Sequence, residues 1–125
     1  MRHGVRSALG AACLAVAFSG CGSSGGGGAY VAPTGPAVKT VAIESSNFHF
    51  TPDKVSVPAG IIEFKLTSTD GQHSLVIEGI PGFQVEAASG ESGTGKVELK
   101  KGKYNFSCNI PGHRAQGMVG TITVG

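Results

Sequence analysis

Residues 104–124 read Tyr104-Asn-Phe-Ser-Cys108-Asn-Ile-Pro-Gly-His113-Arg-Ala-Gln-Gly-Met118-Val-Gly-Thr-Ile-Thr-Val124. This stretch places a thiol, an imidazole and a thioether at even intervals in a loop between two strand-like runs. A thiolate and imidazoles select copper among the available metals, and two histidines with one cysteine and a weak axial thioether are typical of an electron-transfer copper site. The stretch therefore predicts a copper site that takes its second histidine from elsewhere in the chain.

The second histidine is predicted from the direction of side chains along the strands. Side chains two residues apart on a strand face the same way, so His73 shares the inward direction of Leu75 and Ile77. By the same rule Cys108 and Met118 face inward with the apolar residues of their own strands. All three lie at strand ends, where an inward-facing residue reaches the rim of the core. We therefore expect them to converge there.

Each of these residues has a simpler interpretation when it is taken singly. A lone buried cysteine or methionine at a strand end more often packs in the core, and a lone histidine more often lies in a core or a turn. The combination at this spacing and direction favours ligation. His113, on the loop, is expected to be the ligand nearest the surface. His49 alternates outward against Phe48 and Phe50, which are expected to face inward, and is interpreted as a solvent-facing strand residue.

From residue 38 onward, short strand-like runs alternate with turns. The clearest run is 62–66, in which apolar and polar residues alternate as on a half-buried strand. Residues 83–95 are rich in Ser, Gly and Glu in their second half and are interpreted as a short strand followed by a loop. No segment after residue 38 has a convincing helical period. Seven or eight short strands predict an all-β fold, a Greek-key β-sandwich or barrel.

The N-terminal residues indicate export. Residues 1–20 have a basic start and an apolar run, Ala8 to Phe18, that is far shorter than the roughly 20 residues of a membrane-spanning helix, as in a secretory signal. Phe18-Ser-Gly-Cys21 resembles the bacterial lipoprotein cleavage motif, in which the cysteine takes a lipid and becomes the new N-terminus. We therefore expect an extracytoplasmic protein anchored to the bacterial cell membrane through Cys21. The alternative is a secreted or periplasmic soluble protein.

Residues 21–37 are rich in Gly, Ser and Pro and are predicted to be a flexible linker, which leaves residues 38–125 as the folded domain. The net charge of +2 comes from ten basic and eight acidic residues. Two of the basic residues, Arg2 and Arg6, belong to the signal. The mature chain is therefore close to neutral, without the basic balance typical of nucleic-acid binding. With Cys13 removed and Cys21 lipidated, Cys108 is the single free thiol, so no internal disulfide is expected.

The segment Gly102-Lys-Tyr-Asn-Phe-Ser-Cys-Asn-Ile-Pro-Gly-His113, with Gly117 to Val124 after it, resembles the C-terminal signature of the cupredoxins, the small type 1 blue copper proteins such as plastocyanin, azurin and rusticyanin. Residues 57–60 and 64–77 resemble the upstream part of the family. The resemblance implies one type 1 copper per domain, with His73, Cys108 and His113 as equatorial ligands and Met118 as the axial one. Ser74 stands where Asn is common in the family, and we expect Ser74→Asn to shift the reduction potential.

The resemblance implies single-electron exchange between redox partners, without a substrate and without enzyme activity. Copper oxidases of related fold need further histidines, and the domain has only His49 besides the two predicted ligands. A copper carrier is the other alternative, but it needs open, exchangeable coordination. A monomer is expected. Its partners are predicted to dock near His113, on an apolar patch made of Ile110, Pro111, Gly112, Ala115, Gly117 and Met118, with Ile80 and Pro81 from a neighbouring turn.

Overall fold

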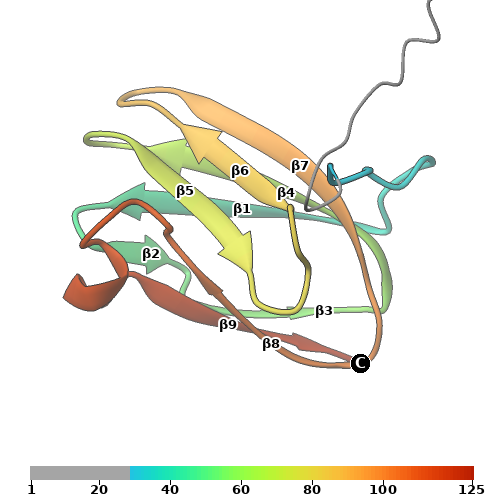
Figure 1. Cartoon of the computed structure of the whole chain (residues 1–125). Coiled ribbons are helices and arrows are strands. Elements are labelled where there is room, and N and C mark those ends of the chain that lie inside the picture. The colour runs from blue at the N-terminus through green and yellow to red at the C-terminus, as the bar shows by residue number, and fades with distance from the viewer. Residues whose placement is uncertain (1–28) are drawn as a thin grey trace, which may run out of the picture.

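Two β-sheets make up the part of the chain that the computed structural model describes, residues 29–125 (Figure 1). One sheet has the strand order β2-β1-β4-β7 and the other the order β3-β9-β8-β5-β6. The predicted all-β sandwich is confirmed, with nine strands in place of seven or eight. The strands are β1 (Lys39–Ser46), β2 (His49–Thr51), β3 (Lys54–Val57), β4 (Gly60–Ser68), β5 (His73–Ile77), β6 (Gln84–Ala87), β7 (Ser92–Leu99), β8 (Gly102–Ser107) and β9 (Val119–Val124).

The core lies between the sheets and follows the alternation of the sequence. On β4, the side chains of Ile62, Phe64 and Leu66 are buried, while Lys65 between them is exposed. Phe106 of β8 meets this layer from the opposite sheet and is also buried. Full burial of a large apolar side chain stabilises the fold by about 1.5–3 kcal/mol. The core therefore fixes which side chain at each strand end faces inward.

Strand β7 corrects the sequence-based expectation. Residues 92–95 were expected to lie in a loop, but they form the first half of β7 and pair with β4. Gly93 and Gly95 share the direction of the buried apolar residues further along β7. A Cβ atom on Gly95 would lie 2.9 Å from a methyl carbon of Val85 and 3.2 Å from the ring of Phe83. The glycines therefore leave room for the side chains of the β6 region, which is why the stretch is poor in apolar residues although it is a strand.

The ends of the β5–β6 hairpin are well separated. His73 at the start of β5 pairs with Ala87, and Val76 pairs with Gln84. The connecting turn, residues 78–83, therefore lies at the opposite end of the hairpin from His73. In Figure 1, the loop from β8 to β9 lies at the end of the sandwich where β5 begins. This loop contains a short 3-10 helix, Arg114–Gln116.

Residues upstream of β1 pack on the other end of the sandwich. The Tyr30 hydroxyl donates a hydrogen bond to the carbonyl oxygen of Lys96 (2.7 Å), and its ring meets the Phe83 ring edge-on with centroids 5.3 Å apart. Lys96 Nζ in turn donates to the carbonyl oxygen of Gly35 (3.0 Å). Part of the predicted linker, from Tyr30 on, is thus in contact with the domain.

The signal, residues 1–20, and Cys21 lie outside the described residues, so the predicted export, lipidation and domain boundaries stay predictions. Among residues 29–125 the structure contains no helix of the length and apolar character required to cross a membrane.

Candidate metal centre

Three of the four predicted ligands meet at one end of the sandwich. The ligand atoms of His73, Cys108 and His113 all lie within 4.8 Å of one another. Cys108 Sγ is 3.5 Å from His113 Nδ1, and the two imidazole rings have centroids 5.1 Å apart. His73 begins β5, Cys108 follows β8, and His113 lies on the loop before β9. Within residues 29–125, this is the one cluster of histidine, cysteine and carboxylate groups close enough to hold a metal ion.

Backbone hydrogen bonds close the loop that carries the other ligands. The Cys108 N–H donates to the carbonyl oxygen of Met118 (3.2 Å), and the Met118 N–H donates to that of His113 (3.2 Å). Gly117 ends the 3-10 helix with φ of 102°, a left-handed conformation that glycine adopts without strain. The Met118 side chain is fully buried. The backbone thus ties Met118 to both loop ligands, and its role as axial ligand stays a prediction.

The site is buried, and one of its donor atoms has no partner. His73 and Cys108 are both fully buried, whereas His113 is half-buried and is the most exposed of the three. His73 Nδ1 is buried without a hydrogen-bond partner among the described residues. A buried polar atom left unsatisfied costs about 1–3 kcal/mol. A metal ion bound through the lone pair of His73 Nδ1 would remove that cost. The donor set of two imidazoles and a thiolate fits copper.

Ser74 connects the cysteine to the ligand loop. Its backbone N–H points to Cys108 Sγ (3.4 Å). Its hydroxyl donates to Asn109 Oδ1 (2.6 Å) and accepts from the Asn109 N–H (3.0 Å). The short hydroxyl therefore braces the start of the loop from β5. Groups of this kind around the ligands tune a metal site.

Asp70 is a residue at the site that the sequence analysis did not single out. Its Oδ1 lies 3.2 Å from His73 Nε2. The hydrogen bond with His73, followed by one from the backbone N–H of Asn47, holds the pKa of Asp70 below its ordinary value. The signal in the sequence was a carboxylate three residues before a predicted ligand, across a glycine turn.

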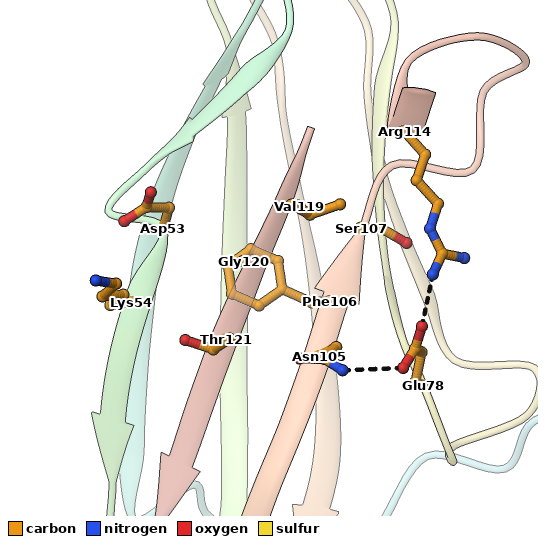
Figure 2. A pocket seen from close by; sticks show the side chains of 10 residues that line it. All are labelled: Asp53, Lys54, Glu78, Asn105, Phe106, Ser107, Arg114, Val119, Gly120 and Thr121. Atoms are coloured by element: carbon orange, nitrogen blue, oxygen red, sulfur yellow. Dashed lines mark hydrogen bonds and ion pairs between the residues drawn. The ribbon is translucent and has the colours of Figure 1, made fainter. Parts of the chain in front are cut away.

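On the outer face of the sheet, Arg114 runs from the ligand loop to the turn after β5 (Figure 2). Its guanidinium donates to Glu78 Oε1 (2.7 Å), and Asn105 Nδ2 donates to Glu78 Oε2 (3.1 Å). The Asn105 hydrogen bond, and then Arg114, hold the pKa of Glu78 below its ordinary value. These residues line a surface pocket of about 400 Å³ that contains none of the predicted ligands. The interaction fastens the ligand loop to the sheet.

The predicted apolar patch near His113 is present in part. Pro111, Gly112, Ala115 and Gly117 are exposed, and Ile110 is half-buried. Met118 is buried and contributes nothing to the surface. Ile80 and Pro81 belong to the turn at the opposite end of the hairpin from His73, so including them in the patch was wrong. Phe48, which the sequence reasoning placed inward, is instead exposed and packs on the His113 ring.

A two-sheet sandwich that gathers two histidines and one cysteine at one end defines the class of β-sandwich copper-binding proteins. A family model described as a cupredoxin-like domain matches residues 10–124, and the chain belongs to this family. A search of curated proteins found no match.

Several solved structures share the fold. Auracyanin B has a TM-score of 0.64 and 21% sequence identity, over 80% of this chain and 96% of that one. The dithionite-reduced auracyanin of Roseiflexus castenholzii has a TM-score of 0.60 and 26% identity, over 72% and 99% of the two chains. Auracyanin A of Chloroflexus aurantiacus, a blue copper protein, has a TM-score of 0.62 and 16% identity, over 69% and 98%. In this family, the arrangement of His73, Cys108 and His113 places them to bind a single copper ion.

Proposed function

We propose that the protein is a type 1 blue copper electron-transfer protein, which shuttles single electrons between redox partners outside the cytoplasm. One observation carries the proposal. Ligand atoms of a buried thiol, a half-buried imidazole and a buried imidazole lie within 4.8 Å of one another at the end of the sandwich, and the buried imidazole has one nitrogen without a partner among the described residues. The chemistry of this donor set is that of an electron-transfer copper site.

Each residue has a separate task in this proposal. Cys108 supplies the thiolate, and the Ser74 N–H stabilises its negative charge. His73 and His113 would supply neutral imidazoles, and Met118 would supply a weak thioether ligand. When bound, copper supplies the change between two oxidation states. The hydrogen-bonded loop and the buried strand ends hold the ligands in one arrangement, so little reorganisation accompanies a change of charge.

Partners are proposed to dock where His113 approaches the surface. Pro111, Gly112, Ala115 and Gly117 give the exposed surface around it a small and apolar part beside the polar Arg114 and Gln116. A patch of this size suits a brief encounter with a redox partner, because such encounters use small interfaces. His113 is the half-buried member of the cluster, nearer the surface than the two buried ones, and is therefore the shortest route for an electron. The docking surface consists of Phe48, Ile110, Pro111, Gly112, Ala115 and Gly117.

The single cluster within residues 29–125 favours an electron carrier over an enzyme, because copper oxidases of related fold use additional copper centres. A copper carrier is disfavoured because two of the three converging residues are fully buried. The proposal also places the protein at the outer face of the cell membrane, anchored by a lipid on Cys21.

Titration of the purified protein with Cu(II) tests the copper site. We expect the intense visible absorption of a copper-thiolate bond at one copper per chain, and its loss in Cys108→Ser. Cys21→Ser is the matched control, since it removes a thiol outside the domain and leaves the absorption unchanged. The same variant tests the anchor: it should move the protein from the membrane fraction to the soluble fraction. A Cys108→Ser protein that keeps the visible band refutes the assignment of the site.

A further inference from the structure

The two nitrogens of His73 have different surroundings. Nε2 lies 3.2 Å from the Asp70 carboxylate, whereas Nδ1 is buried without a partner in the described chain. A neutral imidazole has one donor nitrogen and one acceptor nitrogen. Because an ionised carboxylate can only accept a hydrogen bond, Nε2 carries the proton and donates a hydrogen bond to Asp70. The lone pair is then on Nδ1, the buried nitrogen without a partner, in a residue that offers a ligand atom within 4.8 Å of those of Cys108 and His113.

The turn between β4 and β5 holds this carboxylate in place. The buried Ser68 hydroxyl bonds to the carbonyl oxygens of Gly71 (2.7 Å) and Asp70 (3.2 Å). Gly71 has φ of 67°, which lets the chain turn back toward His73. The backbone N–H of Asn47, from the turn between β1 and β2, also interacts with the carboxylate and helps to hold its pKa below the ordinary value. Two separate segments therefore determine where the acceptor lies.

This arrangement distinguishes the two imidazoles. In the described part of the chain, His73 is the histidine that pairs with a carboxylate, and His113 has no such pair. A carboxylate that accepts a hydrogen bond from the N–H of a ligating imidazole fixes the tautomer of that imidazole and makes it a stronger donor to the metal. Asp70 is 44% exposed, so solvent screens its charge at longer range, and the hydrogen bond carries most of the effect.

Resting on the proposed copper site, we propose that Asp70 is its positioning residue: it selects the Nε2–H tautomer of His73 and lowers the reduction potential of the bound copper. A more basic imidazole stabilises Cu(II) more than Cu(I), because the ion with the higher charge gains more from a stronger donor. Loss of Asp70 therefore raises the potential. Loss of a group of this kind typically weakens metal binding by about 10- to 100-fold.

The first test uses the metal-free protein and needs no copper. Nitrogen-15 NMR at about pH 8, where imidazoles are ordinarily neutral, reports which ring nitrogen of His73 carries the proton. We expect the Nε2–H tautomer in the wild type, retention of it in Asp70→Asn, which keeps an acceptor oxygen, and a mixture of tautomers in Asp70→Ala. Asp53→Asn removes one surface carboxylate elsewhere and is the control. A single Nε2–H tautomer in Asp70→Ala overturns the proposal.

The second test uses the copper-loaded protein. The potential should rise in the order wild type, Asp70→Asn, Asp70→Ala. In Asp70→Ala, a tenfold fall in the ratio of Cu(II) affinity to Cu(I) affinity corresponds to a rise of about 59 mV in the potential. A shift in Asp70→Ala no larger than that in Asp53→Asn overturns the proposal. If the wild-type protein shows no copper-thiolate band, the proposed function fails, while the tautomer measurement still decides whether Asp70 sets the proton on His73.

Discussion

The Phe48 ring stands edge-on against the His113 ring, with centroids 5.2 Å apart and an angle of 76° between the planes. Phe48 precedes β2 in the turn after β1, far from the ligand loop in sequence, and its side chain is 37% exposed. It therefore covers one side of the half-buried ligand without closing it from solvent.

Phe48→Ala should lower the reduction potential of the copper-loaded protein. The apolar shell around a metal site controls solvent access and hence the potential, and water stabilises the more highly charged Cu(II). We expect an effect of about threefold on the Cu(II)/Cu(I) affinity ratio, about 30 mV where tenfold is 59 mV. Voltammetry measures it. The control is Val38→Ala, an exposed apolar residue beside the start of β1, at its opposite end from Phe48; an equal shift there contradicts the prediction.

Charge at Ala115 should slow electron exchange between reduced and oxidised copies of the protein. Two copies that meet through the docking surface bring the charges together, and like charges across an interface cost several kcal/mol. Ala115→Glu and Ala115→Lys should therefore both slow the exchange by about tenfold or more, and salt should restore part of the rate. Gly112 is less suitable for substitution, because its φ of 86° strains any other residue.

NMR line broadening in mixtures of the two oxidation states gives the exchange rate, and the visible spectrum shows whether the site is intact. Ala32→Glu, exposed near Tyr30 on the other end of the sandwich, serves as the control. If this variant slows exchange as much as Ala115→Glu, the docking surface is misplaced.

Met118→Leu should raise the potential while retaining the copper-thiolate band. The buried thioether is proposed to donate weakly to copper and to favour Cu(II), and leucine is close to it in volume. A change of about tenfold in the ratio of Cu(II) affinity to Cu(I) affinity shifts the reduction potential by about 59 mV. Voltammetry and visible spectroscopy on the same sample measure both quantities. An unchanged potential in a variant with the same visible band argues against axial ligation.

Glu78 should make the metal-free protein more sensitive to acid. Its pKa in the fold lies below the ordinary 4.5, chiefly through Asn105 and then Arg114. The stability that it contributes is therefore present above the ordinary pKa and is lost as the pH falls through the lower folded value. Denaturant unfolding from about pH 6 to about pH 3 should show a shallower loss of stability in Glu78→Gln than in wild type. Glu98→Gln, at an exposed position on β7, should follow the wild type.

Gly93→Ala should destabilise the fold more than Gly95→Ala. A Cβ on Gly93 would collide with the backbone carbonyl of Glu86, which is held in β6, whereas on Gly95 it meets side-chain atoms of Val85 and Phe83. Overpacking of this kind costs about 1–3 kcal/mol, and Gly93→Ala should reach or exceed the upper value. Denaturant unfolding of the metal-free proteins measures the difference. Thr94→Ala, exposed between the two, should cost least; the reverse order contradicts the packing argument.

The sequence was most informative where one local rule determines a side chain. Alternation along β5 and β8 was enough to place His73 and Cys108 inward at strand ends, and the short loop brings His113 to the same rim. Alternation failed at Phe48 because this residue lies in a turn, where no strand pairing fixes its direction.

Other features depend on contacts between segments that are distant in sequence. Gly93 and Gly95 looked like loop residues because the side chains that fill the space above them belong to β6 and the turn before it. Asp70 looked like an ordinary turn residue because its partner nitrogen becomes visible only when the His73 ring has a defined orientation. The pairing of Arg114 with Glu78 likewise spans 36 residues of sequence.

The packing of Tyr30 against Phe83 determines which end of the domain the N-terminal residues join. The residues before Tyr30 join the domain beside the β5–β6 hairpin turn, on the far side of the sandwich from His113. If a lipid on Cys21 anchors the protein, the tether joins the domain at the end opposite to the copper site. A tether at that end does not cover the copper site, which therefore stays accessible to a donor or acceptor in the aqueous phase.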